Sequence, residues 1–499
     1  MTFKLITIKL LFLVHAFSKQ SKQTGQLLLA TIIFGFGSFL AHGQDNSSHG
    51  AFLRRYPLTL EAGWRTEAAG PFFYSQQKET ENTWAIPPFY SCDQDPAVAA
   101  HEDDYFYPFL SEIHYGKEHR WQFFQLISTS GGQEQNGATK KRLTLFPLYF
   151  SQRSTDTNLN YTAVVPFYGQ LKNRLFHDEI SFVMFPFYSQ TRKRDVITDN
   201  YLYPFGHRRY GDGLWGWQIW PFVGSEHKDV TTHTNSFGEI ETVAGHDKSF
   251  YLWPLHLKQD TGTGTTNEQK LRASIPLYAY TRSPQRDSTT VLWPFFTWLD
   301  NRERNYHEWE GPWPFVIFAR GEGKTTSRVW PLFSKSHNAV NESDSYCWPV
   351  WQFRRYHAES LDQRHTQVLF YLYSRLTEKN TETGKEKVRL DMWPFFEWHR
   401  DFAGSEKLQV LALAEPFVPD NRGIERNWSP LWSFWRAEDN AKTRASSRSL
   451  LWNLYRQEAM PGHKKTSLLF GLFQYQCDGE TERTRWFYGY SVTRRLAAP

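Results

Sequence analysis

Cysteine is scarce in this sequence. Only three of the 499 residues are cysteines, Cys92, Cys347 and Cys477, and they stand far apart along the chain. An odd and scattered set allows at most one disulfide and offers no cluster of thiolates for a metal ion. The spacing therefore favours three small buried side chains.

Long apolar runs are absent beyond residue 43. A helix that spans a membrane needs about 20 consecutive apolar residues, so the sequence predicts no such helix in this part of the chain. Proline and glycine also recur too often here to permit long helices of any kind. The sequence therefore predicts a chain built from short elements.

Acidic residues and arginine are missing from residues 1–43, where four lysines precede the apolar stretch 27–41 and where Ala41 and Gly43 provide small side chains for cleavage. This pattern predicts a signal peptide that is removed on export. A membrane anchor is the alternative, which the short, glycine-bearing apolar stretch disfavours. We expect residues 1–43 to be a signal peptide, 44–69 a lead-in, and 70–499 a single repeat array.

The chain also lacks an excess of charge of one sign. Without the four lysines of the leader, the 57 basic residues fall to 53, which face 52 acidic residues. A nearly neutral chain without a basic patch has little attraction for a phosphate backbone. We therefore expect no nucleic-acid partner.

Aromatic residues are abundant instead, and 40 Phe, 25 Tyr and 21 Trp make up 17% of the chain. Many of them flank a proline in a recurring three-residue motif. Its copies are Phe146-Pro147-Leu148, Val165-Pro166-Phe167, Phe185-Pro186-Phe187, Tyr203-Pro204-Phe205, Trp220-Pro221-Phe222, Trp253-Pro254-Leu255, Ile275-Pro276-Leu277, Trp293-Pro294-Phe295, Trp313-Pro314-Phe315, Trp330-Pro331-Leu332, Trp348-Pro349-Val350 and Trp393-Pro394-Phe395.

The copies of this motif are regularly spaced. The prolines at 147, 166, 186, 204 and 221 are 19, 20, 18 and 17 residues apart, and those at 276, 294, 314, 331 and 349 are 18, 20, 17 and 18 apart. A fixed period of about 19 residues indicates a repeat architecture, in which each unit buries its apolar side against its neighbours.

Each repeat reads as a pair of β-strands. Aromatic and β-branched residues favour extended backbone, and the segments between the motifs are rich in the turn formers Gly, Asn, Asp, Ser and Thr. Proline cannot donate to a sheet ladder, so we expect it to mark a kink. The prediction is an all-β fold of tandem antiparallel strands or hairpins with aromatic-Pro kinks, closed into a large barrel-like or radial array that leaves no exposed edge.

Several segments depart from the regular motif. We expect a flexible loop over residues 128–141 and a proline-free unit at 368–373. After Pro394 the motif loosens to further units at 415–417 and 429–432, and residues 485–492 form the predicted last strand. Atypical terminal units are common in repeat proteins, where they cap the array.

No catalytic constellation emerges from the motifs. The stretch from Gly211 to Gly216 fits the dinucleotide pattern GxGxxG, but it lacks the strand–helix setting, so we expect a hairpin turn. His101 to Asp104 offers imidazole and carboxylate ligands to a cation, although a charged run in a loop is usually only solvated. The other histidines are scattered singly. We therefore expect neither catalytic residues nor a cofactor, and we assign no metal site.

The aromatic-proline motif itself has two interpretations. Repeated aromatics are what a repetitive core needs, so the first is packing at a kink. The second is a belt of Trp and Tyr that faces lipid or lines an apolar cavity. The residues that would make such contacts are Trp220, Trp253, Trp293, Trp313, Trp330, Trp348 and Trp393.

Two families are similar in style. An exported, aromatic, many-stranded chain resembles outer-membrane β-barrels, and the alternation of Trp486, Tyr488 and Tyr490 looks like a last barrel strand. Its short apolar centres and its prolines depart from that class. Trp293-Pro294-Phe295 and its copies also resemble bacterial β-flower proteins, in which hairpins surround a hydrophobic centre. That second resemblance implies a protein of the bacterial envelope that contacts lipid.

The sequence thus predicts an exported, non-catalytic β-repeat protein of a Gram-negative-type envelope, on the outer membrane or the periplasmic face, that is structural or contacts lipid or another apolar ligand. One alternative is an outer-membrane barrel that forms a pore or scaffold. Another is a secreted enzyme or glycan-binding protein with a site among the loop tips, because Trp-rich surfaces stack on sugars. The sequence leaves the oligomeric state open.

Overall fold

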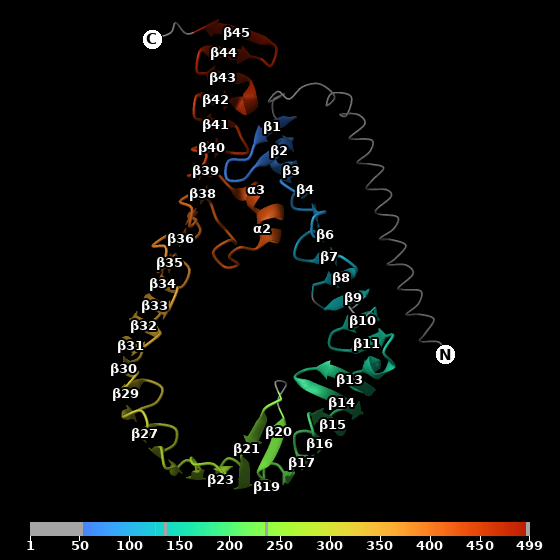
Figure 1. Ribbon diagram of the computed structural model, residues 1–499, viewed down its shortest axis with the longest axis vertical. Coiled ribbons are helices and arrows are strands. Elements are labelled where there is room, and N and C mark those ends of the chain that lie inside the picture. Colours follow the sequence, from blue (N-terminus) through green and yellow to red (C-terminus); the bar gives the residue numbers. More distant parts are fainter. Residues whose placement is uncertain (1–52, 125, 134–136, 235–237, 496–499) are drawn as a thin grey trace. The chain divides into compact units, whose positions relative to one another are not determined.

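The computed structural model describes residues 53–124, 126–133, 137–234 and 238–495 (Figure 1). The chain divides into two compact units, Met1–Ser47 and Ser48–Pro499, and every described residue belongs to the second. The predicted signal peptide at 1–43 lies outside the described residues.

The first part of the described chain is a run of short strands with two 3-10 turns. Its elements are β1 (Arg54–Pro57), β2 (Gly63–Ala68), η2 (Gly70–Phe72), β3 (Phe73–Lys78), β4 (Glu81–Ile86), β5 (Tyr90–Asp95), β6 (Ala100–Tyr105), β7 (Leu110–Tyr115), β8 (Glu118–Phe123), β9 (Ile127–Gln133), β10 (Thr139–Leu145), β11 (Tyr149–Ser154), η3 (Thr157–Leu159), β12 (Tyr161–Val164), β13 (Tyr168–Arg174), β14 (His177–Val183), β15 (Tyr188–Lys193), β16 (Val196–Tyr201), β17 (Gly206–Gly211), β18 (Leu214–Ile219) and β19 (Val223–Lys228).

The middle part continues in the same way. Its elements are β20 (Thr231–Thr234), β21 (Ile240–Val243), β22 (Gly245–Tyr251), β23 (His256–Thr263), β24 (Gln269–Ser274), β25 (Tyr278–Arg282), β26 (Arg286–Val291), β27 (Phe296–Asn301), β28 (Tyr306–Glu310), β29 (Val316–Gly321), β30 (Lys324–Val329), β31 (Phe333–Asn338), β32 (Asn341–Tyr346), β33 (Trp351–Ala358), β34 (Leu361–Val368), β35 (Tyr373–Asn380), β36 (Glu386–Met392), β37 (Phe396–Arg400) and β38 (Glu406–Val410).

The last part contains two short helices and the final strands. Its elements are α2 (Arg422–Asn427), α3 (Ser429–Trp432), β39 (Trp435–Asp439), β40 (Ser446–Leu450), β41 (Tyr455–Met460), β42 (His463–Leu468), η4 (Leu469–Gly471), β43 (Phe473–Asp478), β44 (Thr481–Trp486) and β45 (Tyr490–Arg495). Within the ranges described above, no helix has the length and apolar character that crossing a bilayer requires.

The strands form one long antiparallel meander of 43 strands, in which each strand pairs with its neighbours in the sequence (Figure 1). One hairpin, β20–β21, leaves this order, so β19 pairs directly with β22. The all-β fold of tandem antiparallel strands is thereby confirmed. Among the strands described, no pairing joins β1 to β45, so the hydrogen-bonded ladder itself stays open.

The connections between strands alternate between two kinds along the meander. Every second connection is an apolar turn, usually with an aromatic-proline pair, such as residues 292–295 between β26 and β27. The others are mostly polar, such as 212–213 between β17 and β18. Because successive strands run in opposite directions, all apolar turns fall on one edge of the sheet, which we call the aromatic-proline edge, and the polar turns fall on the opposite edge. Two six-residue strands and their connections account for the period of about 19 residues.

The structure corrects the predicted place of the motif. The prolines lie in the turns and not at kinks inside strands: Pro294 lies between β26 and β27, and β27 begins at Phe296. Proline suits a turn because it lacks the N–H that a ladder position must donate. The predicted last strand at 485–492 is interrupted by a turn at residues 487–489, which separates the end of β44 from the start of β45.

Three further segments differ from their predictions. The loop expected at 128–141 holds most of β9 and the start of β10, and these strands pair in register from Ile127 with Leu145 to Gln133 with Thr139. The units expected at 415–417 and 429–432 belong to a helical insertion between β38 and β39. The ladder also reaches into the expected lead-in 44–69, because β1 and β2 lie there.

Apolar burial is sparse for a chain of this size. The described hydrophobic core is a small cluster of Tyr161, Ala163, Leu171 and Phe182. Many of the fully buried side chains elsewhere are polar, such as those of Asp104 and Asn427. The aromatic residues therefore do not gather in one large interior within the described part of the chain.

Two contacts cover parts of the sheet, and we call them together the covered region. In the first, α2 and α3 pack against β3–β6 and the turns between them. Asn421 caps α2 by accepting from the Ile424 amide at 3.0 Å, and Gly423 lets the helix approach closely, because a Cβ there would lie 2.5 Å from the Tyr107 ring. In the second, β1 contacts β41, β42 and the turn before β41. Arg54 donates to the Asn453 carbonyl at 3.2 Å and to the Ser467 hydroxyl, and the guanidinium of Arg456 lies 3.5 Å from the centre of the Tyr56 ring.

Candidate functional site

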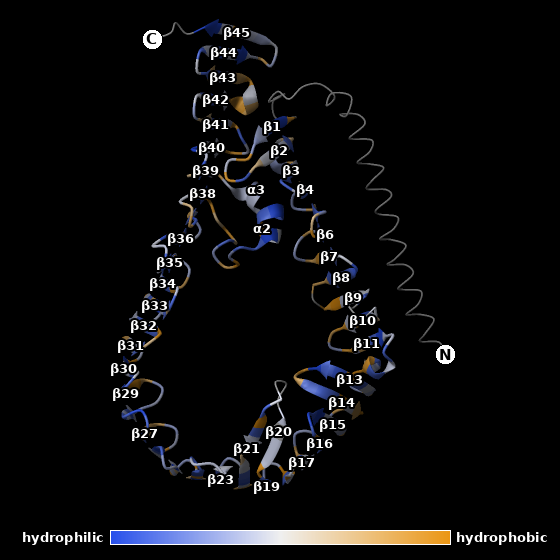
Figure 2. Cartoon of the chain, in the orientation of Figure 1, coloured by the Kyte–Doolittle hydropathy of each residue, from blue (hydrophilic) through white to orange (hydrophobic). Residues whose placement is uncertain are grey.

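The aromatic-proline edge is built from tight, repeated turns. In the turn of residues 292–295 the Phe295 amide donates to the Leu292 carbonyl at 2.9 Å, which closes the loop. The same bond closes the turn at 252–255, from Leu255 to Leu252 at 2.6 Å. Figure 2 shows the hydrophobic colour gathered in the connecting turns, while the strands are largely hydrophilic. The sheet is therefore amphipathic from edge to edge.

Neighbouring turns of this edge are also bonded to one another. The Leu292 amide donates to the Leu277 carbonyl of the preceding turn at 2.8 Å, and the Trp313 amide donates to the Phe295 carbonyl at 2.8 Å. Further along, the Trp330 amide donates to the Phe315 carbonyl at 2.7 Å. Proline has no amide proton to leave unpaired. Much of the backbone polarity of this edge is therefore satisfied without water, which is what an apolar surrounding demands.

The seven predicted contact residues all occupy one equivalent place. Each tryptophan precedes the proline of a turn on the aromatic-proline edge. Six of them are exposed, at 48% for Trp253, 42% for Trp293, 43% for Trp313, 39% for Trp330, 41% for Trp348 and 37% for Trp393, while Trp220 is half-buried. The structure thus places these side chains along one edge and leaves them partly open, instead of burying them in a shared core.

The rings also contact each other from turn to turn. Trp220 and Trp253 have centroids 5.8 Å apart, and Trp330 and Trp348 are separated by the same distance. Phe315 lies 5.7 Å from Trp330. Such tilted pairs stabilise each other by about 0.5–1.5 kcal/mol. They link the side chains of this edge into a ladder of rings.

The opposite edge has a different chemistry. Its turns include Gly116-Lys117, Arg194-Asp195, Asp212-Gly213, and Glu322-Gly323. The turn at Asp212 and Gly213 confirms that the GxGxxG pattern marks a hairpin. The clearest exception is the turn of Leu175 and Phe176, which lie on the polar edge, where Phe176 is 95% exposed. We find no structural reason for that exception.

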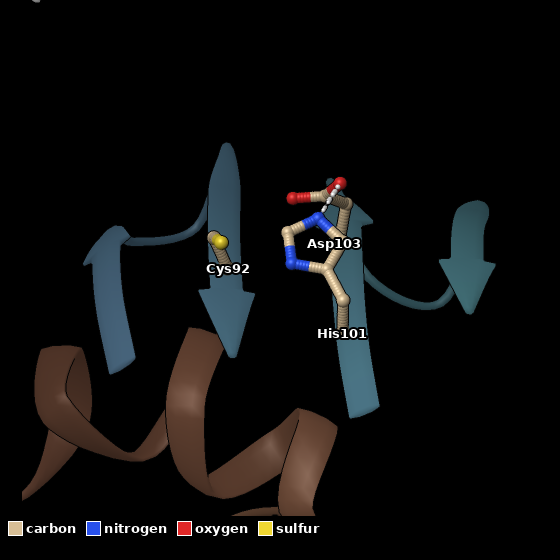
Figure 3. A group of neighbouring side chains, drawn as sticks. All are labelled: Cys92, His101 and Asp103. Carbon is tan, nitrogen blue, oxygen red and sulfur yellow. Dashed lines mark hydrogen bonds and ion pairs between the residues drawn. The ribbon is translucent and has the colours of Figure 1, made fainter. Parts of the chain in front are cut away.

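A second cluster lies on β5 and β6, away from the aromatic-proline edge (Figure 3). Asp103 stands directly opposite Cys92 in the ladder, and His101 lies two residues before Asp103, so the three side chains share one face. His101 Nε2 lies 2.8 Å from Asp103 Oδ2, and Tyr90 donates its hydroxyl to the other oxygen of Asp103. Cys92 and Asp103 are each 2% exposed.

Burial shapes the protonation of this cluster. Burial, with Asp103 nearby, raises the pKa of the Cys92 thiol to about 12. Burial would also raise the pKa of Asp103, but hydrogen bonds from His101 and Tyr90 outweigh it and hold that pKa below its ordinary value. The cluster therefore combines a thiol with a carboxylate whose partners here are neutral or imidazole groups.

Two other groups bring metal-ligand side chains together within the described residues. His337, Glu342 and Asp344 form one of them, and its histidine is exposed. Asp391, Glu397 and His399 form the other. There the guanidinium of Arg389 lies 2.8 Å from Asp391 and 3.7 Å from Glu397, so the positive charge of this arginine already pairs with both carboxylates.

Sequence reasoning found the edge but missed the cluster on β5 and β6. It noted His101 to Asp104 as a possible cation site and treated Cys92 separately as a buried side chain. The sequence alone does not give the strand register that places Cys92 opposite Asp103. A usable signal was the alternating pattern His-x-Asp in the strand that follows a cysteine-bearing strand.

Comparison with known proteins adds no relative: no family model matches this chain, and no curated protein matches it. The interpretation of the site therefore depends on its geometry and chemistry.

Proposed function

We propose that this protein is an exported, non-catalytic β-repeat protein of the bacterial envelope that attaches to lipid through its aromatic-proline edge. The observation that carries the proposal is the long row of exposed apolar turns whose backbone groups are bonded to each other. Tryptophan and tyrosine favour the boundary between lipid and water, where a ring meets both phases. The polar opposite edge then faces water.

The dimensions favour attachment by one edge. Most strands contain six residues, which extend about 20 Å, whereas a strand that crosses a bilayer needs about 9–11 residues. Full burial of a large apolar side chain is worth about 1.5–3 kcal/mol, so a half-exposed tryptophan gains roughly 1 kcal/mol on entering lipid. A row of such turns therefore supplies enough free energy for stable attachment.

Closure of the array belongs to the same proposal. The contacts of β1 with β41 and β42 support a closed arrangement that is held by side chains and not by a hydrogen-bonded ladder. Closure would present the apolar turns as one continuous lipid-facing rim.

The test is flotation of the purified mature protein with phosphatidylcholine vesicles at low and high salt. We expect flotation at both salt concentrations, because apolar contact is not screened as charge attraction is. The triple variant Trp293→Ser, Trp330→Ser and Trp348→Ser should weaken binding at least tenfold, which corresponds to about 1.4 kcal/mol or more.

The matched control removes three aromatic side chains of similar exposure from a sheet face. Trp298, Trp309 and Phe318 are 49%, 37% and 38% exposed and lie on the adjacent strands β27, β28 and β29. Their replacement by serine should leave flotation unchanged. Flotation that is absent, or that both triple variants weaken equally, would overturn the proposal.

A further inference from the structure

The cluster of Cys92, His101 and Asp103 has the composition of a transition-metal site. Their ligand atoms all lie within 4.8 Å of one another, and they combine a soft sulfur, an imidazole nitrogen and a carboxylate oxygen. Of the three groups described above, this one alone contains a cysteine, and the ion pair described for its carboxylate is with His101. The sulfur–nitrogen–oxygen set is one that zinc accepts and that calcium and magnesium do not favour.

We propose that Cys92, His101 and Asp103 bind one divalent ion of the zinc class, with the fourth position held by water. The site is separate from the aromatic-proline edge and does not depend on the proposed attachment to lipid.

The charges of the three ligands balance such an ion. On binding, the Cys92 thiol loses one proton to solvent, so a thiolate, a carboxylate and a neutral imidazole face two positive charges. Without the ion, Asp103 is a carboxylate that is 2% exposed and whose described hydrogen-bond donors are His101 and Tyr90.

The geometry needs only small side-chain movements. Tetrahedral zinc places its ligand atoms about 3.3–3.6 Å apart. His101 Nε2 and Asp103 Oδ2 are 2.8 Å apart, so they must separate by roughly half an ångström, and the sulfur lies within 4.8 Å of both. The backbone ladder fixes the cross-strand pair of Cys92 and Asp103, and rotation about the side-chain bonds supplies the rest.

The surroundings provide supporting contacts and a route of entry. Tyr90 donates to the Asp103 oxygen that His101 does not use, and it can keep that bond when the other oxygen binds the ion. Gln94 Nε2 lies 3.5 Å from the Cys92 sulfur. Such outer contacts orient metal ligands and strengthen binding. The side chain of His101 is 30% exposed, so the ion enters from its side.

The test is titration of the chelator-treated mature protein with Co²⁺ under reducing conditions, followed by absorption spectroscopy. We expect one Co²⁺ per chain, a near-ultraviolet charge-transfer band from the thiolate, and visible bands of tetrahedral intensity that Zn²⁺ abolishes by displacement. Cys92→Ser should remove the charge-transfer band, and His101→Gln or Asp103→Asn should weaken binding more than tenfold.

The controls replace other cysteine and histidine side chains that could bind the metal ion. Cys347→Ser, Cys477→Ser and His337→Gln should each leave the spectrum and the affinity unchanged. Far-ultraviolet circular dichroism must show that the Cys92→Ser protein is folded; if it is not, loss of the band in His101→Gln with a folded chain serves as the test. Absence of a charge-transfer band in the unaltered protein, or its loss in Cys347→Ser or Cys477→Ser, would refute the site.

Discussion

The covered region and the open stretch of the aromatic-proline edge use the same kind of turn differently. Around Tyr107 the turn is covered: Asn421 donates to its hydroxyl at 3.0 Å, and Trp428 donates its indole N–H to its carbonyl at 2.8 Å. The rings of Trp293 and Trp330 are 42% and 39% exposed, and the described ring contacts of Trp330 are with Phe315 and Trp348 of the neighbouring turns.

The difference shows what an apolar turn requires. Where the chain carries an insertion, α2 and α3 cover a turn, and the contact also buries charged groups such as Arg426, which is 8% exposed. Between Trp313 and Trp348 the turns meet one another through backbone hydrogen bonds and ring contacts. The covered region should therefore govern the stability of the protein, while the open turns remain available to an outside apolar phase.

The largest effect should come from breaking the covered region at Arg426. Its guanidinium lies 2.9 Å from Asp93, 2.7 Å from Glu102 and 2.8 Å from Asp104. Arg426→Met leaves these carboxylates without their cation. We expect the free energy of unfolding to fall by about 3–5 kcal/mol, because the buried negative charges are then unpaired. A fall in the urea midpoint of unfolding would measure it.

The matched control for that change is Arg422→Met on the same helix. The Arg422 side chain is 75% exposed and 3.7 Å from Glu81. Exposed ion pairs contribute little, so the unfolding midpoint should hardly move. Equal losses in the two variants would mean that helix propensity, and not the buried cluster, holds the helix in place.

A second prediction compares one tryptophan from each region. Trp428 packs against Phe106 with ring centroids 5.6 Å apart, so Trp428→Ser should destabilise the fold by about 3–5 kcal/mol and leave vesicle binding unchanged under native conditions. Trp330→Ser should cost roughly 1 kcal/mol or less in stability and should weaken vesicle binding several-fold. Paired unfolding and flotation measurements separate the two, and a reversed pattern would contradict the division into covered and open regions.

Part of this architecture can be predicted from local sequence. The period, the strands and the turns follow from residues whose preferences act over short distances, such as Pro294 between aromatic rings and Asp212-Gly213 at a polar tip. The proline-free unit at 368–373 also appears as a turn between β34 and β35. Proline at a turn and proline at a kink give the same pattern, which is why the sequence predicts a kink where the structure has a turn.

The remainder depends on contacts distant in sequence. Pro430 lies in the first turn of α3, where proline is as well accommodated as in a β-turn, so residues 429–432 resemble another repeat unit in the sequence. The contact of Arg426 with Asp93 joins residues that are 333 positions apart, and no local sequence pattern predicts it. Whether the aromatic rings are buried or exposed is likewise set by what lies against them, and that is decided by the whole fold.

The smallest effect concerns a charge buried in the covered region. Lys465 on β42 is 7% exposed and stands opposite Glu458, and burial lowers the pKa of its ammonium to about 8. Below pH 8 both the folded and the unfolded chain hold the proton, so the cost of burying the charge is fully present. Between about pH 8 and the ordinary value of 10.5 the unfolded chain binds more protons, so stability rises with pH.

Lys465→Met should therefore stabilise the protein at neutral pH, by about 1–3 kcal/mol, and should abolish this rise. Urea unfolding of both proteins from pH 7 to 10.5 measures the difference, which should shrink as the pH increases. The exposed neighbour supplies the control, because Lys464→Met should leave the curve of the unaltered protein unchanged. A difference in stability that stays constant over this pH range would mean that Lys465 keeps its proton in the folded protein. Glu458 would then stabilise the buried ammonium as well as water stabilises the exposed lysines on the open part of the sheet.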